Sequence, residues 1–446
     1  MIQLPQKLKE RFQEDMDFHV IQPAYLGVIP VWIAGYKTLV NIPETLILLE
    51  TQAQRISNAS EAVVPFLHGV GMAIKGIDME QQAVKAILKG LLIIYHEPTG
   101  TCISVLPVPS TLSRAIEAPS TENVLRGSIS SFNEDMDANI GMIRKHVACE
   151  DLQLKLFSLG KHKSVQLGIM YLSDVIDPNL VKQVVERIEG NLDKNVRNIQ
   201  QLSKVMGFPN WSFVTKFNTT ELPQNVTVAL EEGKLVILLD RFPFALIIPS
   251  LLSDMFALED DANFPIVFML FLRVLRVAGI LITVLIPGLY VALVSVNPEV
   301  LRIELALSIA KSRIDVPYPA FVETFLMLVI LELILEASIR LPKSIGPTVT
   351  MVGGIILGEA IVSAKLVSNL LIIILSATTI ASATVVGYQN SVSIRVLKYL
   401  VLILSSIYGI MGLVSGVVLI AAYLASLDTF GIPYFQLKRA KGDNRG

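Results

Sequence analysis

The sequence predicts an α/β N-terminal region of two small subdomains, followed by an all-α polytopic membrane domain of four to six membrane helices. Three observations predict this fold. The chain has 446 residues, of which 52% are apolar and only 17% are charged. Only 14 of its 37 basic and 9 of its 39 acidic residues lie after residue 261, where the longest apolar segments also lie. Before that point, short apolar strands alternate with helical patterns, as in α/β folds.

The first subdomain, residues 1–110, is expected to begin with a short polar helix or a frayed end within residues 1–18. Pro30 predicts an edge strand or a bulge, because proline cannot donate a hydrogen bond within a sheet. A turn at 98–100 is expected to join two strands into a hairpin. The expected strands are 27–36, 90–95 and 101–108, and the expected helices are 43–55 and 79–88.

The second subdomain, residues 111–258, is expected to follow a linker rich in turn-forming residues at 118–132. Its first helix ends in Arg144-Lys145-His146, cations that suit a helix C-terminus. Its second helix starts at Pro178, since proline favours the first turn of a helix. The expected helices are 133–148 and 178–192, and the expected strands are 165–171, 213–217 and 234–240.

The membrane domain, residues 259–446, offers five candidate crossings, at 277–296, 319–339, 345–366, 367–386 and 396–427. Pro287 is expected to kink the first of them, and Arg273 and Arg276 to reach the membrane interface from its start. Five crossings from a cytoplasmic N-terminus would put the basic C-terminal tail outside, against the positive-inside rule. Four crossings with a re-entrant segment at 319–339 would avoid that conflict.

The segment 319–339 is the most unusual, because it is long enough to span a bilayer and yet carries several charges. Glu332, Glu336 and Arg340 follow each other at i, i+4 and i+8, so they share one helix face. That face is expected to meet a partner helix, another subunit or water rather than lipid. Two interpretations stay open: a structural Glu336–Arg340 ion pair, or an ion path or gate. Glu323 and Glu359 are further candidates.

Two small-xxx-small spacings permit close helix packing, Gly354 with Gly358 and Gly412 with Gly416. Each is either an internal helix contact or a subunit interface.

Motifs for catalysis and cofactor binding are not evident. Gly69-Val70-Gly71 does not complete a dinucleotide-binding fingerprint, because position 74 is Ile. The five histidines form no HExxH pair, and no Gly-x-Ser-x-Gly elbow occurs. Cys102 and Cys149 stand far apart and suit a reducing compartment. With a charged N-terminus that lacks a signal-peptide pattern, we expect a non-enzymatic chain, without metal or cofactor, whose N-terminal half stays cytoplasmic.

One string has a more specific meaning. PSTENVLRGSISSFNEDMDANIGMIRK, at 119–145, resembles a signature of the GerA family of spore germination proteins, in its A-subunit branch. Further matching strings follow in order: TTELP at 219–223, EEGKLVILLD at 231–240, RVLR at 273–276, PGLYVAL at 287–293, VPYPAFVE at 316–323, EASIRLPKSIG at 336–346 and FGIPYF at 430–435. The residues that carry the resemblance are Glu122, Arg126, Gly127, Arg144, Glu221, Pro223, Arg273, Arg276 and Pro287.

The resemblance implies the membrane subunit of a nutrient germinant receptor in the spore inner membrane, with a two-part N-terminal domain on the cytoplasmic side. It implies assembly with a transporter-like B subunit and a lipoprotein C subunit, and oligomerisation of the chain itself into a nutrient-gated ion channel. Independently of the resemblance, the net charge of −2 argues against an interaction with nucleic acid.

The sequence also departs from the family pattern. An arginine and an aspartate of a TTERPD string are replaced together by Leu222 and Gln224. The usual D-G-x-P turn reads Asp240-Arg241-Phe242-Pro243, and the arginine of LREA is Leu335. Both tails are short. Two alternative functions are therefore kept: a secondary transporter of a small nutrient, which would need an internal repeat, and a non-conducting scaffold subunit.

Overall fold

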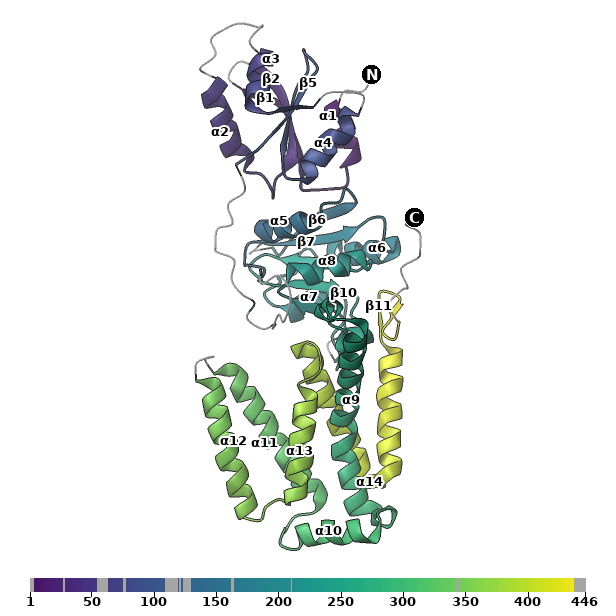
Figure 1. Ribbon diagram of the computed structural model, residues 1–446. Coiled ribbons are helices and arrows are strands. Elements are labelled where there is room, and N and C mark those ends of the chain that lie inside the picture. Colours follow the sequence, from purple (N-terminus) through teal and green to yellow (C-terminus); the bar gives the residue numbers. More distant parts are fainter. Residues whose placement is uncertain are drawn as a thin grey trace. The chain divides into compact units, whose positions relative to one another are not determined.

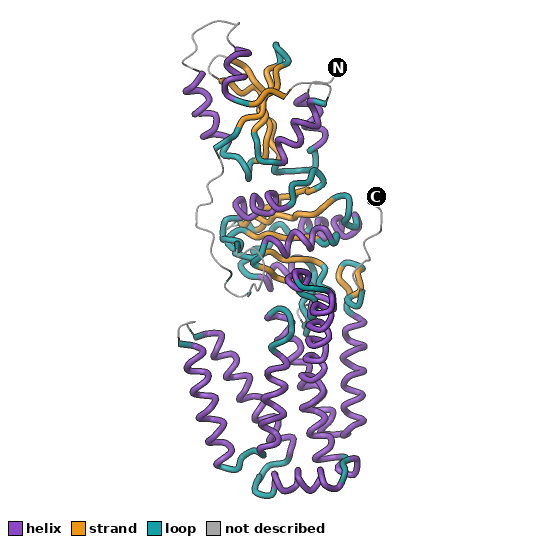
Figure 2. Tube along the Cα trace, in the orientation of Figure 1, coloured by secondary structure: helices purple, strands orange, loops and turns teal. Residues whose placement is uncertain are grey.

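The computed structural model describes residues 4–26, 29–53, 63–74, 78–108, 119, 122, 130–161, 164–209, 211–341 and 345–436. These residues divide into two compact units. The first consists mainly of Met1–Asn210 and Lys216–Pro249, and the second of Trp211–Thr215 and Ser250–Leu437. The first contains the α/β part of the chain, and the second is helical (Figures 1 and 2).

The first unit begins with a five-stranded antiparallel sheet in the order β1-β2-β4-β5-β3. Its strands are β1 Phe18–Leu26, β2 Ile29–Tyr36, β3 Met72–Ile74, β4 Leu92–His96 and β5 Thr101–Val105. Its helices are α1 Leu4–Arg11, α2 Ile42–Ala53, α3 Val63–Val70 and α4 Met79–Leu88. The expected hairpin of β4 and β5 is confirmed. The expected edge position of Pro30 is wrong, because β2 lies between β1 and β4; a register shift lies in β1 instead.

A second antiparallel sheet follows in the order β6-β7-β9-β10-β8. Its strands are β6 Leu152–Leu159, β7 Val165–Leu172, β8 Asn218–Thr220, β9 Leu235–Leu239 and β10 Ala245–Ile248. The helices are α5 Met136–His146, α6 Pro178–Glu189, α7 Ile199–Val205 and α8 Pro223–Glu231. α5 and α8 share one buried apolar core with the sheet. Asp177 caps α6 by accepting the N–H of Asn179, and Pro178 occupies its first turn as expected.

The expected strand at 213–217 is wrong. These residues form no strand, and 211–215 group with the helical unit instead. Val214 is buried there in an apolar core with Met255, Leu424 and Tyr434. The Val214 side chain therefore packs within the helical unit rather than along a sheet.

The helical unit contains long helices with a shorter one, α10, lying across one end (Figures 1 and 2). The helices are α9 Ile266–Val291, α10 Ile303–Arg313, α11 Ala320–Arg340, α12 Gly346–Ser363, α13 Asn369–Ser382 and α14 Tyr388–Ser426. A π-helical turn, Ala292–Val296, extends α9. α11 is one continuous helix of 21 residues rather than a broken, re-entrant segment.

The expectation of one long helix at 396–427 is wrong, because the chain reverses at Gly409. Gly409 has φ 61° and ψ −134°, outside the helical region, so α14 consists of two helices. They lie side by side: a Cβ on Gly416 would lie 3.2 Å from the Cα of Val401. Asn297 stabilises the reversal by accepting the N–H of Ile410 at 3.0 Å. Glycine is required because other residues adopt positive φ only at a cost.

Both ends of the helical unit meet. The N–H of Leu252 donates to the carbonyl of Tyr434 at 3.0 Å. Tyr434 follows a short hairpin of β11 Asp428–Thr429 and β12 Ile432–Pro433. With α14 counted as two, the described part of this unit has six long helices, an even number, which brings the chain back to the end where it entered.

Candidate functional site

The charged stripe expected on α11 divides into two separate interactions. Arg340 binds Glu336 one turn earlier, with Nη2 2.6 Å and Nε 2.8 Å from Oε1. The Glu336 side chain is 50% exposed and that of Arg340 is 77% exposed. The ion pair is therefore present, but it lies on the surface of the unit.

Glu332 points to a different partner. Its carboxylate accepts from Arg395 Nη1 at 2.7 Å and from Lys398 Nζ at 2.9 Å, both on α14. The two cations are largely buried. Because one carboxylate balances two cations, Glu332 connects α11 to α14 and keeps these cations from lying unpaired among apolar side chains. The sequence did not indicate these partners, which lie more than 60 residues away.

Glu323 is buried at the other end of α11. It accepts the backbone N–H of Ser368 at 2.6 Å, and Arg313 Nε lies 3.3 Å from its second oxygen. The Ser368 hydroxyl lies 3.2 Å from the hydroxyl of Tyr290. One carboxylate thus joins α9, α10, α11 and the N-terminus of α13, where the helix dipole favours negative charge.

Glu359 lies exposed on α12, a helix with few contacts. Side chains at Gly353, Gly354 and Gly358 would meet nothing within 4 Å. A Cβ at Gly412, by contrast, would collide with the carbonyl of Leu404. Gly412 and Gly416 therefore form an internal contact between the two parts of α14. Gly354 and Gly358, by contrast, face no described residue closely enough to form such a contact.

Arg276 has partners within the chain at the start of α9. It binds Asp261 through both terminal nitrogens, one of them at 2.9 Å, and it donates to the carbonyl of Phe256 at 3.1 Å. Arg273 Nε lies 3.9 Å from the same carboxylate. Burial alone would raise the pKa of Asp261, but the Arg276 hydrogen bonds hold that pKa below its ordinary value. The start of α9 is thus fixed by an ion pair.

Pro287 lies inside α9, as expected. Next to it, a Cβ on Gly288 would lie 2.9 Å from the Ser405 hydroxyl, so α9 and α14 approach closely there. The bundle tolerates the missing N–H of Pro287 at a point of close helix packing.

Arg144 belongs to a buried ionic cluster in the α/β unit. Its Nη2 binds Asp15 at 2.7 Å, and its Nε binds Asp17 at 2.7 Å. Its guanidinium carbon lies 4.0 Å from the ring centre of Tyr36. Thr38 adds a hydroxyl hydrogen bond to Asp17 at 2.6 Å. The sequence singled out Arg144 as a residue of the family resemblance and as a cation that suits a helix C-terminus, but its partners Asp15 and Asp17 were missed.

Glu122 and Glu221 also meet. The Glu122 carboxylate accepts the N–H of Glu221 at 2.9 Å and the hydroxyl of Thr220 at 3.0 Å. Pro223 starts α8. Two residues expected to matter, Arg126 and Gly127, lie outside the described residues.

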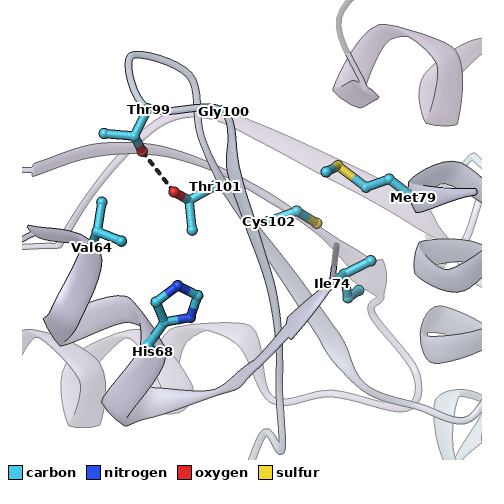
Figure 3. A pocket seen from close by; sticks show the side chains of 8 residues that line it. All are labelled: Val64, His68, Ile74, Met79, Thr99, Gly100, Thr101 and Cys102. Carbon is cyan, nitrogen blue, oxygen red and sulfur yellow. Dashed lines mark hydrogen bonds between the residues drawn. The ribbon is translucent and has the colours of Figure 1, made fainter. Parts of the chain in front are cut away.

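A cavity of about 330 Å³ lies in the first subdomain (Figure 3). Its lining includes His68, Met79, Thr101 and Cys102. Burial raises the pKa of the Cys102 thiol to about 12, so this thiol stays protonated at neutral pH. A protonated thiol is neither a strong nucleophile nor a good metal ligand. Within the described residues, no group of three His, Cys, Asp or Glu side chains could hold a metal ion.

Comparison with known proteins decides the family. The model of the Bacillus/Clostridium GerA spore germination protein family matches residues 6–441. The chain belongs to the GerA family. Its relatives in that family include spore germination protein GerLA of Bacillus cereus, 34% identical over 79% of this chain and 71% of the relative. Spore germination protein B1 of Bacillus subtilis is 35% identical, over 73% of this chain and 67% of the relative. Spore germination protein A1 of the same organism is 31% identical, over 80% and 74%.

One solved structure also resembles this GerA-family chain. It is the N-terminal domain of the A subunit of the Bacillus megaterium spore germinant receptor GerK3, with a TM-score of 0.40 and 20% identity. The match covers 55% of this chain and 93% of that one.

In this GerA-family chain, two helical segments pass the length and composition test for crossing a membrane, Ile266–Val296 and Tyr388–Ser426, the second of which contains the reversal at Gly409. Shorter apolar helices are Met351–Ser363 and Asn369–Ser382. Membrane association follows from the family together with these helices.

Proposed function

We propose that this GerA-family chain is the multi-pass A subunit of a nutrient germinant receptor in the spore inner membrane, with its α/β unit in the cytoplasm. It would assemble with a transporter-like B subunit and a lipoprotein C subunit, and with further copies of itself, into a nutrient-gated ion-conducting complex. The proposal includes no catalysis. The observation that carries it is the set of exposed charges on α11 and α12.

These charges fit poorly against lipid. Glu336, Arg340 and Glu359 are exposed on helices whose other exposed residues are mostly apolar. A charged side chain in the centre of a bilayer costs about 2.5–3.5 kcal/mol on insertion scales, so such residues usually face a protein interior or a water-filled path. An oligomer in which α11 and α12 face a shared aqueous path would hydrate these charges.

The even number of helices supports a multi-pass topology. Counting the two parts of α14, six helices would cross the membrane and return the chain to its starting side. That arrangement would place the basic tail, which includes Lys438, Arg439 and Lys441, in the cytoplasm with the N-terminus. It agrees with the positive-inside rule, which the five crossings expected from the sequence did not.

The test is monovalent-cation release from spores that carry Glu336→Gln, measured across a nutrient panel. We expect release to slow by about tenfold, equivalent to about 1.4 kcal/mol, while blotting shows normal protein levels. Normal release from a stable Glu336→Gln protein would contradict the proposal.

Glu332→Gln is the matched control, because it removes the same charge from the same helix. It leaves Arg395 and Lys398 without their carboxylate, so we expect lower protein levels rather than a stable receptor with altered release.

The alternative functions predict different results. If the chain is a non-conducting scaffold, exchanging Glu336 and Arg340 should restore release fully, because the ion pair is kept. If the chain lines a conducting path, the same exchange should restore cation release only in part.

A secondary transporter would instead show uptake of labelled nutrient by vesicles that contain this chain alone.

A further inference from the structure

The loop 211–215 carries the most exposed aromatic side chain of the helical unit. Trp211 is 95% exposed, and Phe213 beside it is more than half exposed. The residues on both sides of this loop belong to the α/β unit, yet the loop itself packs with the helices. Tryptophan side chains are mostly buried in folded proteins, so packing within the chain does not explain why the Trp211 ring is exposed.

The loop is held firmly at the end of α14. The N–H of Phe213 donates to the Tyr423 hydroxyl at 2.9 Å, and the two rings lie 5.8 Å apart, edge to face. Ser212 Oγ lies 3.3 Å from the same hydroxyl. Val214 is buried in the apolar core with Leu424. The exposure of Trp211 is therefore a feature of an ordered loop.

The position of Tyr423 indicates what surrounds Trp211. Tyr423 lies three residues before Ser426, the last residue of α14. Tyr423 lies near the end of the second part of α14, about 20 Å of helix from the reversal at Gly409 at 1.5 Å per residue. Tyrosine and tryptophan are enriched at membrane interfaces, so the end of α14 that carries Tyr423 suits the border between the apolar layer and the headgroups.

We propose that Trp211 and Phe213 form an aromatic anchor that enters the lipid headgroup region beside Tyr423. The loop thereby fixes one segment of the α/β half of the chain to the bilayer surface. The indole suits this location because its apolar ring and its N–H donor match a region that is half apolar and half hydrated. The inference rests on the membrane location proposed above and adds a specific lipid contact to it.

The test uses the full chain in phospholipid vesicles, with tryptophan fluorescence as the readout. The sequence contains two tryptophans, Trp32 and Trp211, so Trp32→Phe leaves Trp211 alone. Two quenchers are compared: lipids brominated near the glycerol backbone, and aqueous iodide on both sides of the vesicles. We expect Trp211 to be quenched strongly by the brominated lipid and weakly by iodide, with emission shifted to shorter wavelength than in the unfolded chain.

Two control variants make the result decisive. Trp211→Phe leaves Trp32, which lies in the first sheet and should not respond to brominated lipid. Trp32→Phe with Trp211→Phe and Val418→Trp places the only tryptophan on the exposed surface of α14, where lipid should quench it. If Trp32→Phe fails to fold, the difference in emission between the wild type and Trp211→Phe gives the same information.

The inference is overturned if iodide quenches Trp211 while brominated lipid does not, or if neither quencher acts because protein covers the ring. In either case, lipid quenching of the Val418→Trp variant would leave the proposed membrane subunit intact. If that variant also escapes lipid quenching, the membrane location itself is wrong.

Discussion

One guanidinium in the α/β unit balances two buried carboxylates. Arg144 and both aspartates, Asp15 and Asp17, are nearly inaccessible to solvent. Burial raises the pKa of Asp15, and the Arg144 charge opposes that rise. Because Arg144 belongs to α5 and both aspartates precede β1, the cluster joins the two sheets of this unit. Buried ions of this kind destabilise a fold when one partner is removed.

We predict that Arg144→Met lowers the free energy of unfolding of the α/β unit by about 3–5 kcal/mol, because two buried carboxylates lose the guanidinium that pairs with them. Denaturant unfolding of the detergent-solubilised Trp211→Phe chain, followed through Trp32 fluorescence, measures this change.

Lys37→Met is the control for Arg144→Met, because Lys37 and Asp137 form an exposed pair between the same two parts, 3.7 Å apart. Its loss should change the same free energy by less than about 1 kcal/mol. If Arg144→Met and Lys37→Met lowered the free energy of unfolding equally, the buried cluster would contribute no more to stability than the exposed ion pair.

The sequence supported some of these residue assignments and not others. Helical spacing gave a Glu336–Arg340 ion pair as one of two open interpretations, and the two side chains do pair. It could not show that Glu332 turns to α14, because its two partners lie on another helix. Nor could it connect Arg144 with Asp15, since contacts across more than a hundred residues leave no local pattern in one sequence.

At the scale of elements, the largest difference from the predicted fold is the reversal of the chain at Gly409, inside α14. Gly409 stands between apolar residues that continue on both sides, with no proline or charge to mark a turn. Glycine is common in membrane helices, so its presence alone does not indicate a break. Only the positive φ and the contact with Asn297 reveal the hairpin.

We predict that Gly409→Ala destabilises the helical unit by about 1–3 kcal/mol, the usual cost of a non-glycine residue in a sparsely populated backbone region. A Cβ there would also press against Asn297. The midpoint of thermal unfolding in detergent should fall. Gly353→Ala, on α12 with open space around it, should leave the midpoint unchanged. If the unfolding midpoint fell equally in Gly409→Ala and Gly353→Ala, the positive φ of Gly409 would not be the cause of the destabilisation.

The strand expected at 213–217 failed for a different physical reason. Alternating apolar residues predict a strand whenever a sheet is available to receive them. Here the apolar side chain of Val214 enters a core made mostly by helices that lie far along the sequence. Tertiary packing overrode a correct local pattern.

For the whole molecule, composition alone separated an α/β half from a helical half. The long apolar segments were recognised from the sequence. Among the short strands of the first half, β4, β7 and β9 were predicted, whereas β6 and the wholly apolar β10 were missed. The number of crossings was harder, because it depends on single reversals such as Gly409. One missed turn changes the parity and so moves the C-terminus to the other side.

We predict that the C-terminus lies on the cytoplasmic side with the N-terminus, because the six crossings proposed above would return the chain to its starting side. Reporter fusions that are active on only one side of the membrane, placed at each end, measure this directly. A fusion after Gly446 that reports the outside would require an odd number of crossings and would refute the six-helix topology.

The core around Val214 has a consequence for biosynthesis. Val214 is translated well before Leu424, Leu427 and Tyr434, which share its core, and only shortly before Met255, which also belongs to it. The loop therefore has only part of its docking site until the second part of α14 and the hairpin after it have been translated. A product that terminates before Leu424 would leave Val214 partly uncovered for recognition by chaperones or proteases.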